Sequence, residues 1–251
     1  MQSENEGSPE GLANYTIAFA EGGMVLAYST NSRNAGTIAD PNTPFTPPSS
    51  VPNAAANWYS QLVQPSVLIG GSNPFLDPSG YRADMIFQLA ALRYRMPALY
   101  NTLLEHYTIT RPTDVLGTNY DYQFIYEHSA LAAYQASPST YRYVKLPPAV
   151  NLSRDRRDQR YSQAVTVVPG LGVPGSASQV AIPGTRVIWG LTILRTAPNY
   201  ANAVQFLQLL FSAQGVALQS ATGPAPISPP VVSAADYGQV PSELQSLVSQ
   251  Q

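Results

Sequence analysis

The chain has 251 residues, enough for one large domain or for two lobes of ordinary size. Hydrophobic residues make up 44% and can form a sizeable core, whereas the charged residues, at 11%, fall far below the roughly one quarter of an average protein. The net charge of −2 gives no electrostatic basis for binding nucleic acid or an acidic membrane, and the absence of cysteine excludes disulfides and thiolate metal sites.

The first sixty residues are predicted to alternate between loops and short elements. A polar lead at 1–13 is expected to be flexible, and strand-like runs follow at 15–19 and 24–28. Five prolines make 40–56 a low-complexity surface loop, which ends at a short helix over 57–63. The acidic start is unlike a secretory signal, and no apolar run reaches the roughly 18 residues of a membrane span, so we expect no export signal in this chain.

The stretch 67–96 combines a buried strand, a loop and a helix. An apolar run at 67–69 is stopped by two glycines, and 72–80 is rich in the residue types of loops. Apolar residues recur at helical spacing from Met85, and this spacing continues through 97–107. A helix that begins after such a loop directs free N–H groups and its positive dipole end at the loop, which can bind an anion. An ordinary strand–loop–helix connection is the alternative.

The remainder continues to alternate between strands and helices, which predicts an α/β fold. Strands are expected at 121–126, 143–146, 163–168 and 186–194. Helices are expected at 129–136 and from 198 to 223 with an interruption at Gly215, and the apolar stripe of the latter is Ala203, Phe206, Leu207, Leu210 and Phe211. A Gly/Pro/Ser loop is expected over 169–184, and a Pro- and Ser-rich tail with one short helix at 241–249 closes the chain.

The sequence lacks the motifs of common catalytic sites. It has no Gly-x-Ser-x-Gly nucleophile turn, no phosphate loop ending in Gly-Lys-Ser/Thr and no dinucleotide Gly-x-Gly-x-x-Gly. The two histidines, His106 and His128, leave little for a histidine-based metal centre. We therefore predict that the protein is not an enzyme and has no cofactor.

Two carboxylates are predicted to follow strands. Asp77 lies in the loop after the first buried strand, and Glu127, next to His128, follows the aromatic strand. Because ligands of open α/β sheets bind beyond the carboxyl ends of the strands, these residues indicate a cleft. Each also has a plain structural explanation: Asp77 can cap the next helix, Arg82 can be a salt-bridge partner, and the residues after the aromatic strand can be solvated.

A specific pattern occurs at 72–82, where Ser-Asn-Pro-Phe-Leu-Asp-Pro-Ser-Gly-Tyr-Arg is similar to Ser-Asn-Pro-x-x-Asp-Pro-Cys-Gly-Tyr-Arg. Four further segments are similar to segments of the same proteins and follow in the same order: 15–29, 121–129, 143–152 and 187–211. Through these five segments, which lie within 14–230, the chain resembles the archaeal-type tungstate/molybdate-binding proteins of ABC importers.

The resemblance implies a type II periplasmic-binding-protein fold, in which two α/β lobes joined by crossover strands close on an oxyanion. Asp77 matches the aspartate of the family's loop, and Pro78 and Ser79 complete the ligand-contacting turn, with Ser79 in place of cysteine. A carboxylate repels a free oxyanion, but it is attracted to a hard, high-valent Mo or W centre that it binds directly. The implied ligand is therefore molybdate or tungstate.

Further ligand residues are implied by the same resemblance. The family often has a glutamate before the tyrosine of its strand-end segment; here that place is Ile125. Glu127, two residues on and expected on the same side of the strand, could take its place as the second metal-binding carboxylate, with Tyr126 beside it. Glu21 and Gly22 fall in the crossover region, where related binders offer a backbone N–H.

The resemblance also divides the chain into a lead with the first crossover strand (1–28), the second lobe (29–142), a return crossover with the C-terminal part of the first lobe (143–223) and a tail (224–251). Compared with the family, the start of the first lobe is missing, so lobe one is expected to be incomplete and the chain alone to bind oxyanion poorly. The resemblance further implies an extracytoplasmic location, the permease subunits of an ABC transporter as partners, and a lipid or membrane anchor on the missing segment.

Two other functions remain open. A binder or sensor of another oxyanion, such as sulfate or phosphate, would fit the same fold, and loss of the second carboxylate would favour a tetrahedral anion. An α/β enzyme with Asp77 as acid or base and Arg82 as anion clamp would instead need a group of raised pKa in the cleft.

Overall fold

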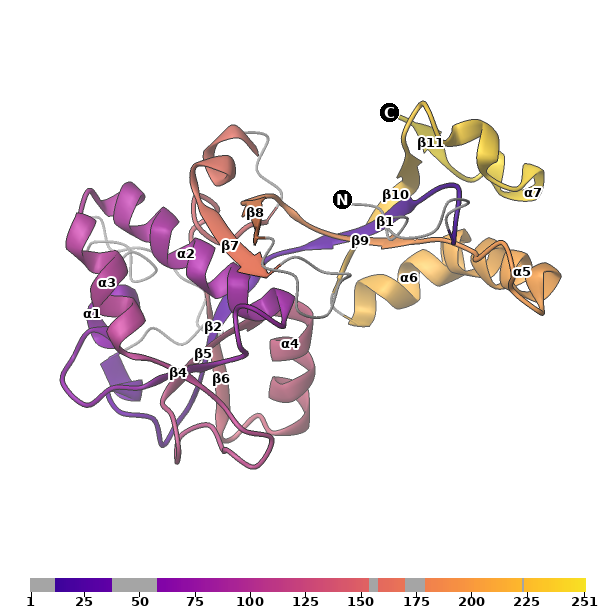
Figure 1. The fold of residues 1–251 in the computed structure, drawn as a ribbon. Coiled ribbons are helices and arrows are strands. Elements are labelled where there is room, and N and C mark those ends of the chain that lie inside the picture. Colours follow the sequence, from indigo (N-terminus) through magenta and orange to yellow (C-terminus); the bar gives the residue numbers. More distant parts are fainter. Residues whose placement is uncertain (1–11, 38–57, 154–157, 170–178, 223) are drawn as a thin grey trace, which may run out of the picture. The chain divides into compact units, whose positions relative to one another are not determined.

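The computed structural model shows most of the chain as strands and helices. The described residues are 12–37, 58–153, 158–169, 179–222 and 224–251. Figure 1 labels the elements along the chain, and their mixture of strands and helices confirms the predicted α/β class. The expected Pro-rich loop at 40–56 and most of the expected lead at 1–13 lie outside the described residues.

The chain divides into two compact units. The described residues of unit 1 lie within Met1–Glu21 and Ile188–Gln251. Unit 2 comprises Gly22–Gly170 and Ser176–Val187. Within the described residues the chain therefore passes between the units twice, after residue 21 and after residue 187.

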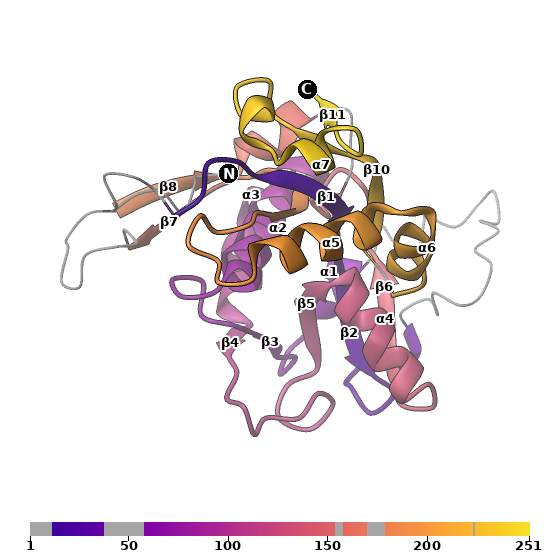
Figure 2. The same cartoon turned by 90° about the vertical axis from the view of Figure 1, so that its right-hand side faces the viewer.

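Unit 2 is built on a five-stranded sheet. Its strands, in spatial order, are β4 (Tyr107–Ile109), β3 (Ile69–Gly71), β5 (Tyr122–Tyr126), β2 (Met24–Ser29) and β6 (Tyr141–Lys145), and Figure 2 shows their labels in this order from left to right. β3 runs parallel to β4 and β5, whereas β2 runs antiparallel to β5 and β6. β3, β5 and β6 therefore end at one edge of the sheet, where β2 begins, and we call this the carboxyl edge.

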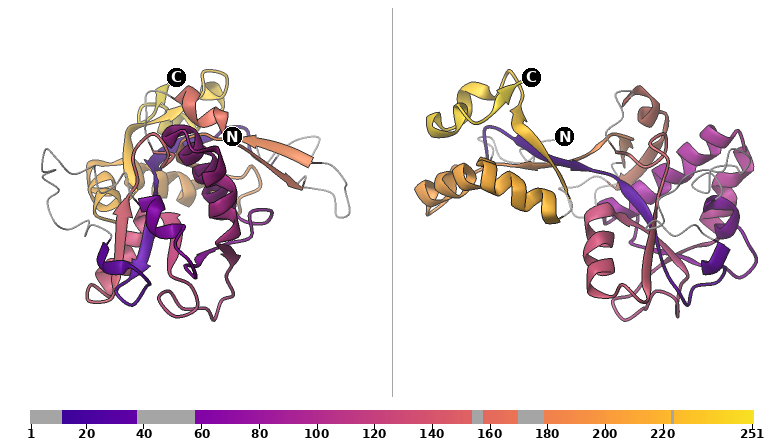
Figure 3. Two further views of the ribbon diagram at one scale, coloured as in Figure 1. Left: turned by 90° about the vertical axis from the view of Figure 1, so that its left-hand side faces the viewer. Right: turned by 180° about the vertical axis from the view of Figure 1, so that it is seen from behind.

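Helices cover both faces of this sheet. α2 (Pro78–Tyr94) and α3 (Pro97–Glu105) lie on one face and α4 (Glu127–Ala136) on the other (Figure 3). Such covering explains why all six residues of the central strand β2 are buried. The helices agree with the predicted ones, except that Arg95, with a φ of 56°, separates α2 from α3, and α4 begins at Glu127 rather than at residue 129.

Aromatic side chains fill the space between α2 and the sheet. Phe124 of β5 receives Trp58 and Phe87 edge-on, with ring centroids 5.7 Å and 5.2 Å away. Trp58 belongs to the short predicted helix, now α1 (Trp58–Leu62), and is 1% exposed. These rings supply large apolar areas to the core, so they fix α1 and α2 against the sheet that carries the carboxyl edge.

A small hairpin-like sheet in unit 2 departs from the prediction. β7 (Val165–Pro169) pairs antiparallel with β8 (Gln179–Pro183), so part of the loop expected over 169–184 is a strand. The rest of that expected loop, 170–178, lies outside the described residues. The prediction failed because β8 is mostly exposed or half-buried, and such a strand is defined by backbone pairing rather than by an apolar run. The described part of unit 2 also contains two short 3₁₀ helices, Ala35–Thr37 and Asp158–Gln163.

Unit 1 contains a four-stranded sheet whose composition was only partly predicted. Its spatial order is β11 (Ser249–Gln250), β10 (Ala225–Val232), β1 (Ile17–Gly22) and β9 (Val187–Leu191). β10 pairs antiparallel with β1, so residues expected to form a Pro- and Ser-rich tail supply an inner strand. Three prolines within β10 mask its strand character in the sequence. A 3₁₀ helix (Tyr237–Gln239) and α7 (Ser242–Gln245), within the expected helix at 241–249, follow it.

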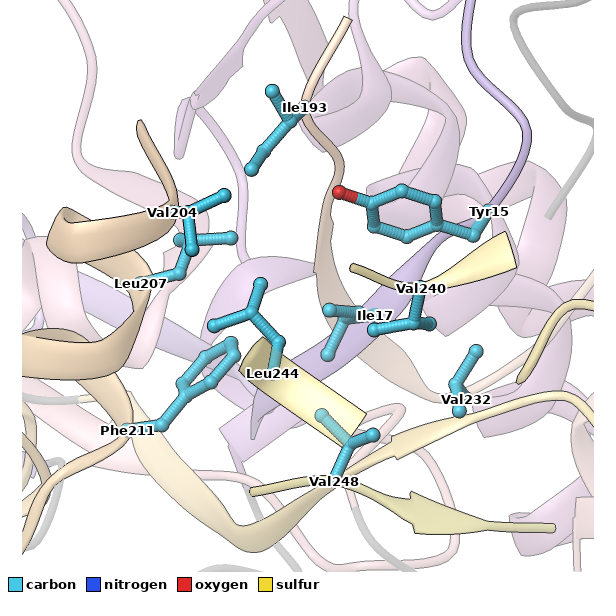
Figure 4. Close-up of a cluster of buried hydrophobic side chains, with 10 residues drawn as sticks. All are labelled: Tyr15, Ile17, Ile193, Val204, Leu207, Phe211, Val232, Val240, Leu244 and Val248. Carbon is cyan, nitrogen blue, oxygen red and sulfur yellow. The ribbon is translucent and has the colours of Figure 1, made fainter. Parts of the chain in front are cut away.

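The core of unit 1 joins helix α5 to this sheet. α5 (Tyr200–Phe211) and α6 (Ala213–Thr222) agree with the predicted pair of helices, and none of the described helices is both long and apolar enough to cross a membrane. Figure 4 shows the core side chains: Tyr15, Ile17, Ile193, Val204, Leu207, Phe211, Val232, Val240, Leu244 and Val248. Phe206, a member of the expected apolar stripe, is 60% exposed, and Val204, outside that stripe, is buried.

Two tyrosines with raised pKa values should make the stability of the protein depend on pH. The pKa values of Tyr15 and Tyr100 are raised to about 12, mainly because burial penalises the charged phenolate; at Tyr100 the neighbouring Asp84 adds to this. The unfolded chain loses these protons near pH 10, whereas the folded chain keeps them. We therefore expect the free energy of unfolding, measured by urea titration at stepped pH, to fall as pH rises from about 10 to 12. A constant value across this window would contradict the assignment.

Candidate functional site

Asp77 caps helix α2 at the end of the loop that follows β3. Its backbone is extended, with a φ of −138°, and its Oδ1 accepts hydrogen bonds from the Ser79 amide at 2.7 Å and the Ser79 hydroxyl at 2.5 Å. Pro78 occupies the first helical turn, where the missing N–H costs nothing. Asp77 therefore does cap α2, as its structural explanation predicted, and the cap fixes the carboxylate in one orientation.

The hydrogen bonds around Asp77 keep it ionised. Burial, the largest single influence, pushes its pKa up, but hydrogen bonds from Ser79, from the Gly80 amide and from Ser72 outweigh it, so the pKa of Asp77 lies below its usual value. A general acid in an active site needs the opposite shift. The lowered pKa of Asp77 therefore suits a carboxylate that stays ionised and binds a ligand directly.

The loop before Asp77 is held tightly against the start of α2. The hydroxyl oxygens of Ser79 and Ser72 lie 3.1 Å apart, within hydrogen-bond distance, and the Tyr107 hydroxyl donates to the Ser72 carbonyl at 2.7 Å. A Cβ on Gly80 would lie only 2.5 Å from that same carbonyl, so the backbone can approach this closely only at a glycine. The turn at Asp77 is thus preformed, with its hydroxyl and carboxylate side by side.

Arg82 and Tyr126 connect this turn to the end of β5. The Arg82 Nη1 donates to the Tyr126 hydroxyl, and the guanidinium carbon lies 5.2 Å from the centre of the Tyr126 ring. Burial raises the pKa of Tyr126 and Asp77 adds to the rise, whereas Arg82 opposes it. His128 stacks on the same ring at 5.7 Å, and burial lowers the pKa of His128. The structure therefore brings Asp77, Arg82, Tyr126 and His128 together at the carboxyl edge.

Glu127 lies at the same edge but not in the expected conformation. It is the first residue of α4 rather than a continuation of the strand, so the expectation that it faces the same side of β5 as Ile125 is wrong. Its amide donates to the Gly23 carbonyl at 2.9 Å, and its carboxylate forms an ion pair of 2.6 Å with Lys145 Nζ. The hydrogen bond to Glu127 is the main reason that the pKa of Lys145 is raised, with burial opposing it.

Lys145 is the residue at this edge that was missed by sequence reasoning. It ends β6, and the register places it opposite Val25, next to the start of β2. The signal was available, because Lys145 is the only lysine in the sequence. What the sequence does not show is that β6 ends beside α4, which is a consequence of the strand order.

The crossover residues are placed by the strands that contain them. Glu21 is the last residue of unit 1, where it is buried and pairs with Ala225 of β10. Gly22 ends β1 and begins unit 2, one residue before the glycine whose carbonyl accepts from Glu127. Among the described side chains, no group of three or more His, Cys, Asp and Glu is placed to hold a free metal ion.

Comparison with known proteins gives a consistent family assignment. A family model described as bacterial extracellular solute-binding protein matches residues 5–223. An uncharacterized solute-binding protein of Petrotoga mobilis is 30% identical over 253 residues, covering 98% of this chain and 70% of that protein. Molybdate/tungstate-binding proteins WtpA of Pyrococcus abyssi and Thermococcus kodakarensis are each 28% identical over 269 residues, covering 94% of this chain and 69% and 67% of those proteins.

Similarity to solved structures also extends over most of the chain. The sulfate-binding protein SubI from Mycobacterium tuberculosis matches with a TM-score of 0.49 and 13% sequence identity, covering 99% of this chain and 69% of that chain.

Proposed function

Because this chain belongs to the bacterial extracellular solute-binding protein family, we propose that it captures tungstate or molybdate outside the cytoplasm and delivers it to the permease subunits of an ABC transporter. The two relatives at 28% identity that are named for molybdate and tungstate support the choice of ligand. In this proposal the protein binds its ligand without converting it and needs no cofactor.

The observation that carries the proposal is the preformed turn at Asp77. The ionised carboxylate of Asp77 is held by hydrogen-bond donors of its own turn, namely those of Ser79, Gly80 and Ser72. A free oxyanion would be repelled by such a group, whereas a hard metal centre within an oxyanion would be bound by it. We propose that Asp77 binds the Mo or W centre and that Pro78 and Ser79 line the ligand.

The other residues of the carboxyl edge have assigned roles in the same proposal. Tyr126, whose hydroxyl is fixed by Arg82, would border the ligand, and Glu127 would be the second carboxylate near the metal centre. The amides near Glu21 and Gly22 would supply backbone donors. Each of these roles is proposed from position and chemistry.

A second candidate is a tetrahedral dianion such as sulfate. The ion pair between Glu127 and Lys145 favours it, because a carboxylate already neutralised by an ammonium repels a dianion less and is less available to a metal centre. The two candidates differ in whether a second carboxylate contributes to binding.

Isothermal titration calorimetry of the chain with tungstate, molybdate, sulfate and phosphate tests the proposal. We expect tungstate and molybdate to bind with micromolar dissociation constants, about 1 to 100 µM, and sulfate and phosphate to bind more weakly. Tighter binding of sulfate would support the second candidate, and the absence of binding to all four anions would contradict both.

A further inference from the structure

Lys145 stands out by composition as well as by position. The sequence holds 13 lysines and arginines, and Lys145 is the only lysine among them. Its ammonium lies 2.6 Å from Glu127 Oε1, and its side chain is 67% exposed. An ammonium has three N–H donors, so a lysine that donates one hydrogen bond to Glu127 still has two further N–H groups.

The partner of Lys145 is fixed by the backbone. The Glu127 amide donates to the Gly23 carbonyl at 2.9 Å, which ties the start of α4 to the start of β2. Across the sheet, Val25 of β2 pairs with Ile125 on one side and with Lys145 on the other. The ion pair therefore spans β2, from the end of β6 to the start of α4, and its acidic member sits on a rigid element.

We propose that Lys145 is a specificity-determining residue of the anion site, because its ion pair with Glu127 competes with the binding of a metal centre by that carboxylate. This inference rests on the proposed function and adds to it the residue that sets the choice between anions. Lys145 acts through Glu127, so it is a positioning residue rather than a metal ligand.

The physical consequence differs between the anions. With Lys145 in place, the charge of Glu127 is balanced, and a tetrahedral dianion can approach the edge. With Lys145 removed, the free carboxylate repels sulfate, whose sulfur accepts no further ligand. The same carboxylate can bind tungstate through the metal centre, because a hard, high-valent metal takes additional oxygen ligands. Lys145 therefore reduces the preference for tungstate over sulfate.

If the Lys145–Glu127 ion pair served only to stabilise the fold, replacing Lys145 would change stability and not the choice between anions. An ion pair with a mostly exposed lysine contributes little to the stability of a fold. Replacement of Lys145 should therefore leave the thermal midpoint nearly unchanged, and any effect of the replacement on anion binding should depend on the carboxylate of Glu127.

The test measures the dissociation constants of tungstate and sulfate by calorimetry and compares five proteins. They are the wild type, Lys145→Met, Lys145→Arg, Glu127→Gln and the double variant that combines Glu127→Gln with Lys145→Met. We expect the ratio of the sulfate to the tungstate constant to rise at least about tenfold in Lys145→Met. Lys145→Arg keeps the ion pair and should stay within about twofold of the wild type. The ratio in the double variant should match the ratio in Glu127→Gln, because no carboxylate remains to be released and the ammonium left in Glu127→Gln attracts both dianions alike.

The outcomes separate this inference from the proposed function. If the wild type prefers tungstate and Lys145→Met leaves the ratio unchanged, the inference is wrong and the proposed function stands. A rise that persists in the double variant would also overturn it, because the effect would not pass through Glu127. If the wild type binds neither anion, the proposed function and this inference fall together.

Discussion

Replacing Asp77 with serine is expected to weaken tungstate and molybdate binding at least about 100-fold. Losing a residue that only holds a metal ligand in place already costs roughly 10- to 100-fold in metal affinity, so the loss of a direct ligand should reach or exceed that range. Serine caps a helix about as well as aspartate, so the fold of the turn should survive and the free energy of unfolding should stay within about 0.5 kcal/mol of the wild type. Calorimetry and urea unfolding on the same preparation measure both quantities.

Asp77→Ala provides the matched comparison for this prediction. Alanine removes both the carboxylate and the cap, so the variant should lose anion binding and about 1 kcal/mol of stability. Sulfate serves as the internal control, because it offers no metal centre and its binding should not weaken when a negative charge is removed. Unchanged tungstate affinity in Asp77→Ser would show that the Asp77 carboxylate only caps α2.

The turn at Asp77 could be predicted from the sequence because its determinants are local. A strand run, two glycines, loop residues and helical spacing all lie within 67–96, and the structure places β3, the loop and α2 there. The capping geometry also follows from local chemistry, since an Asp before Pro at the start of a helix accepts from the next amides. The structure adds the close approach of Gly80 to the Ser72 carbonyl.

Features that depend on distant pairing could not be predicted. β8 and β10 are strands because of the partners they meet, and their own prolines or exposed residues hide that fact. Glu127 was expected to face the same side as Ile125 because the strand's period of two was extended past the end of the strand, to the point where α4 begins. Its ion pair with Lys145 requires the strand order of the sheet, which no local pattern contains.

A buried carboxylate on α2 has no role at the carboxyl edge but connects three elements of unit 2. Asp84 is 9% exposed and accepts hydrogen bonds from Gln88 Nε2 at 2.9 Å and from the Tyr100 hydroxyl of α3 at 2.9 Å. It also accepts from the hydroxyl of Thr166 in β7, which is itself buried. A carboxylate with three donors has its charge compensated, whereas donors deprived of their acceptor are costly inside a protein.

We therefore expect Asp84→Ala to lower the free energy of unfolding of unit 2 by about 3 kcal/mol. The hydroxyls of Tyr100 and Thr166 lose a charged acceptor, whereas the Gln88 amide keeps the Val165 carbonyl. Each buried donor left without a partner costs roughly 1 to 3 kcal/mol, reduced where water can enter the space. Asp84→Asn retains an acceptor oxygen and should lose less. The effect on anion binding should be small, because the loop before α2 is held by Ser72, Ser79 and Tyr107.

The fluorescence of Trp58 measures this loss in unit 2. The chain has two tryptophans, and in a Trp189→Phe background only Trp58, 1% exposed in the core of unit 2, would report urea unfolding. Glu105→Ala is the control, because this carboxylate ends α3 on the surface and its removal should change stability by no more than about 0.5 kcal/mol. If Asp84→Ala cost no more than this control, the hydrogen bonds of Asp84 would contribute nothing to holding α2, α3 and β7 together.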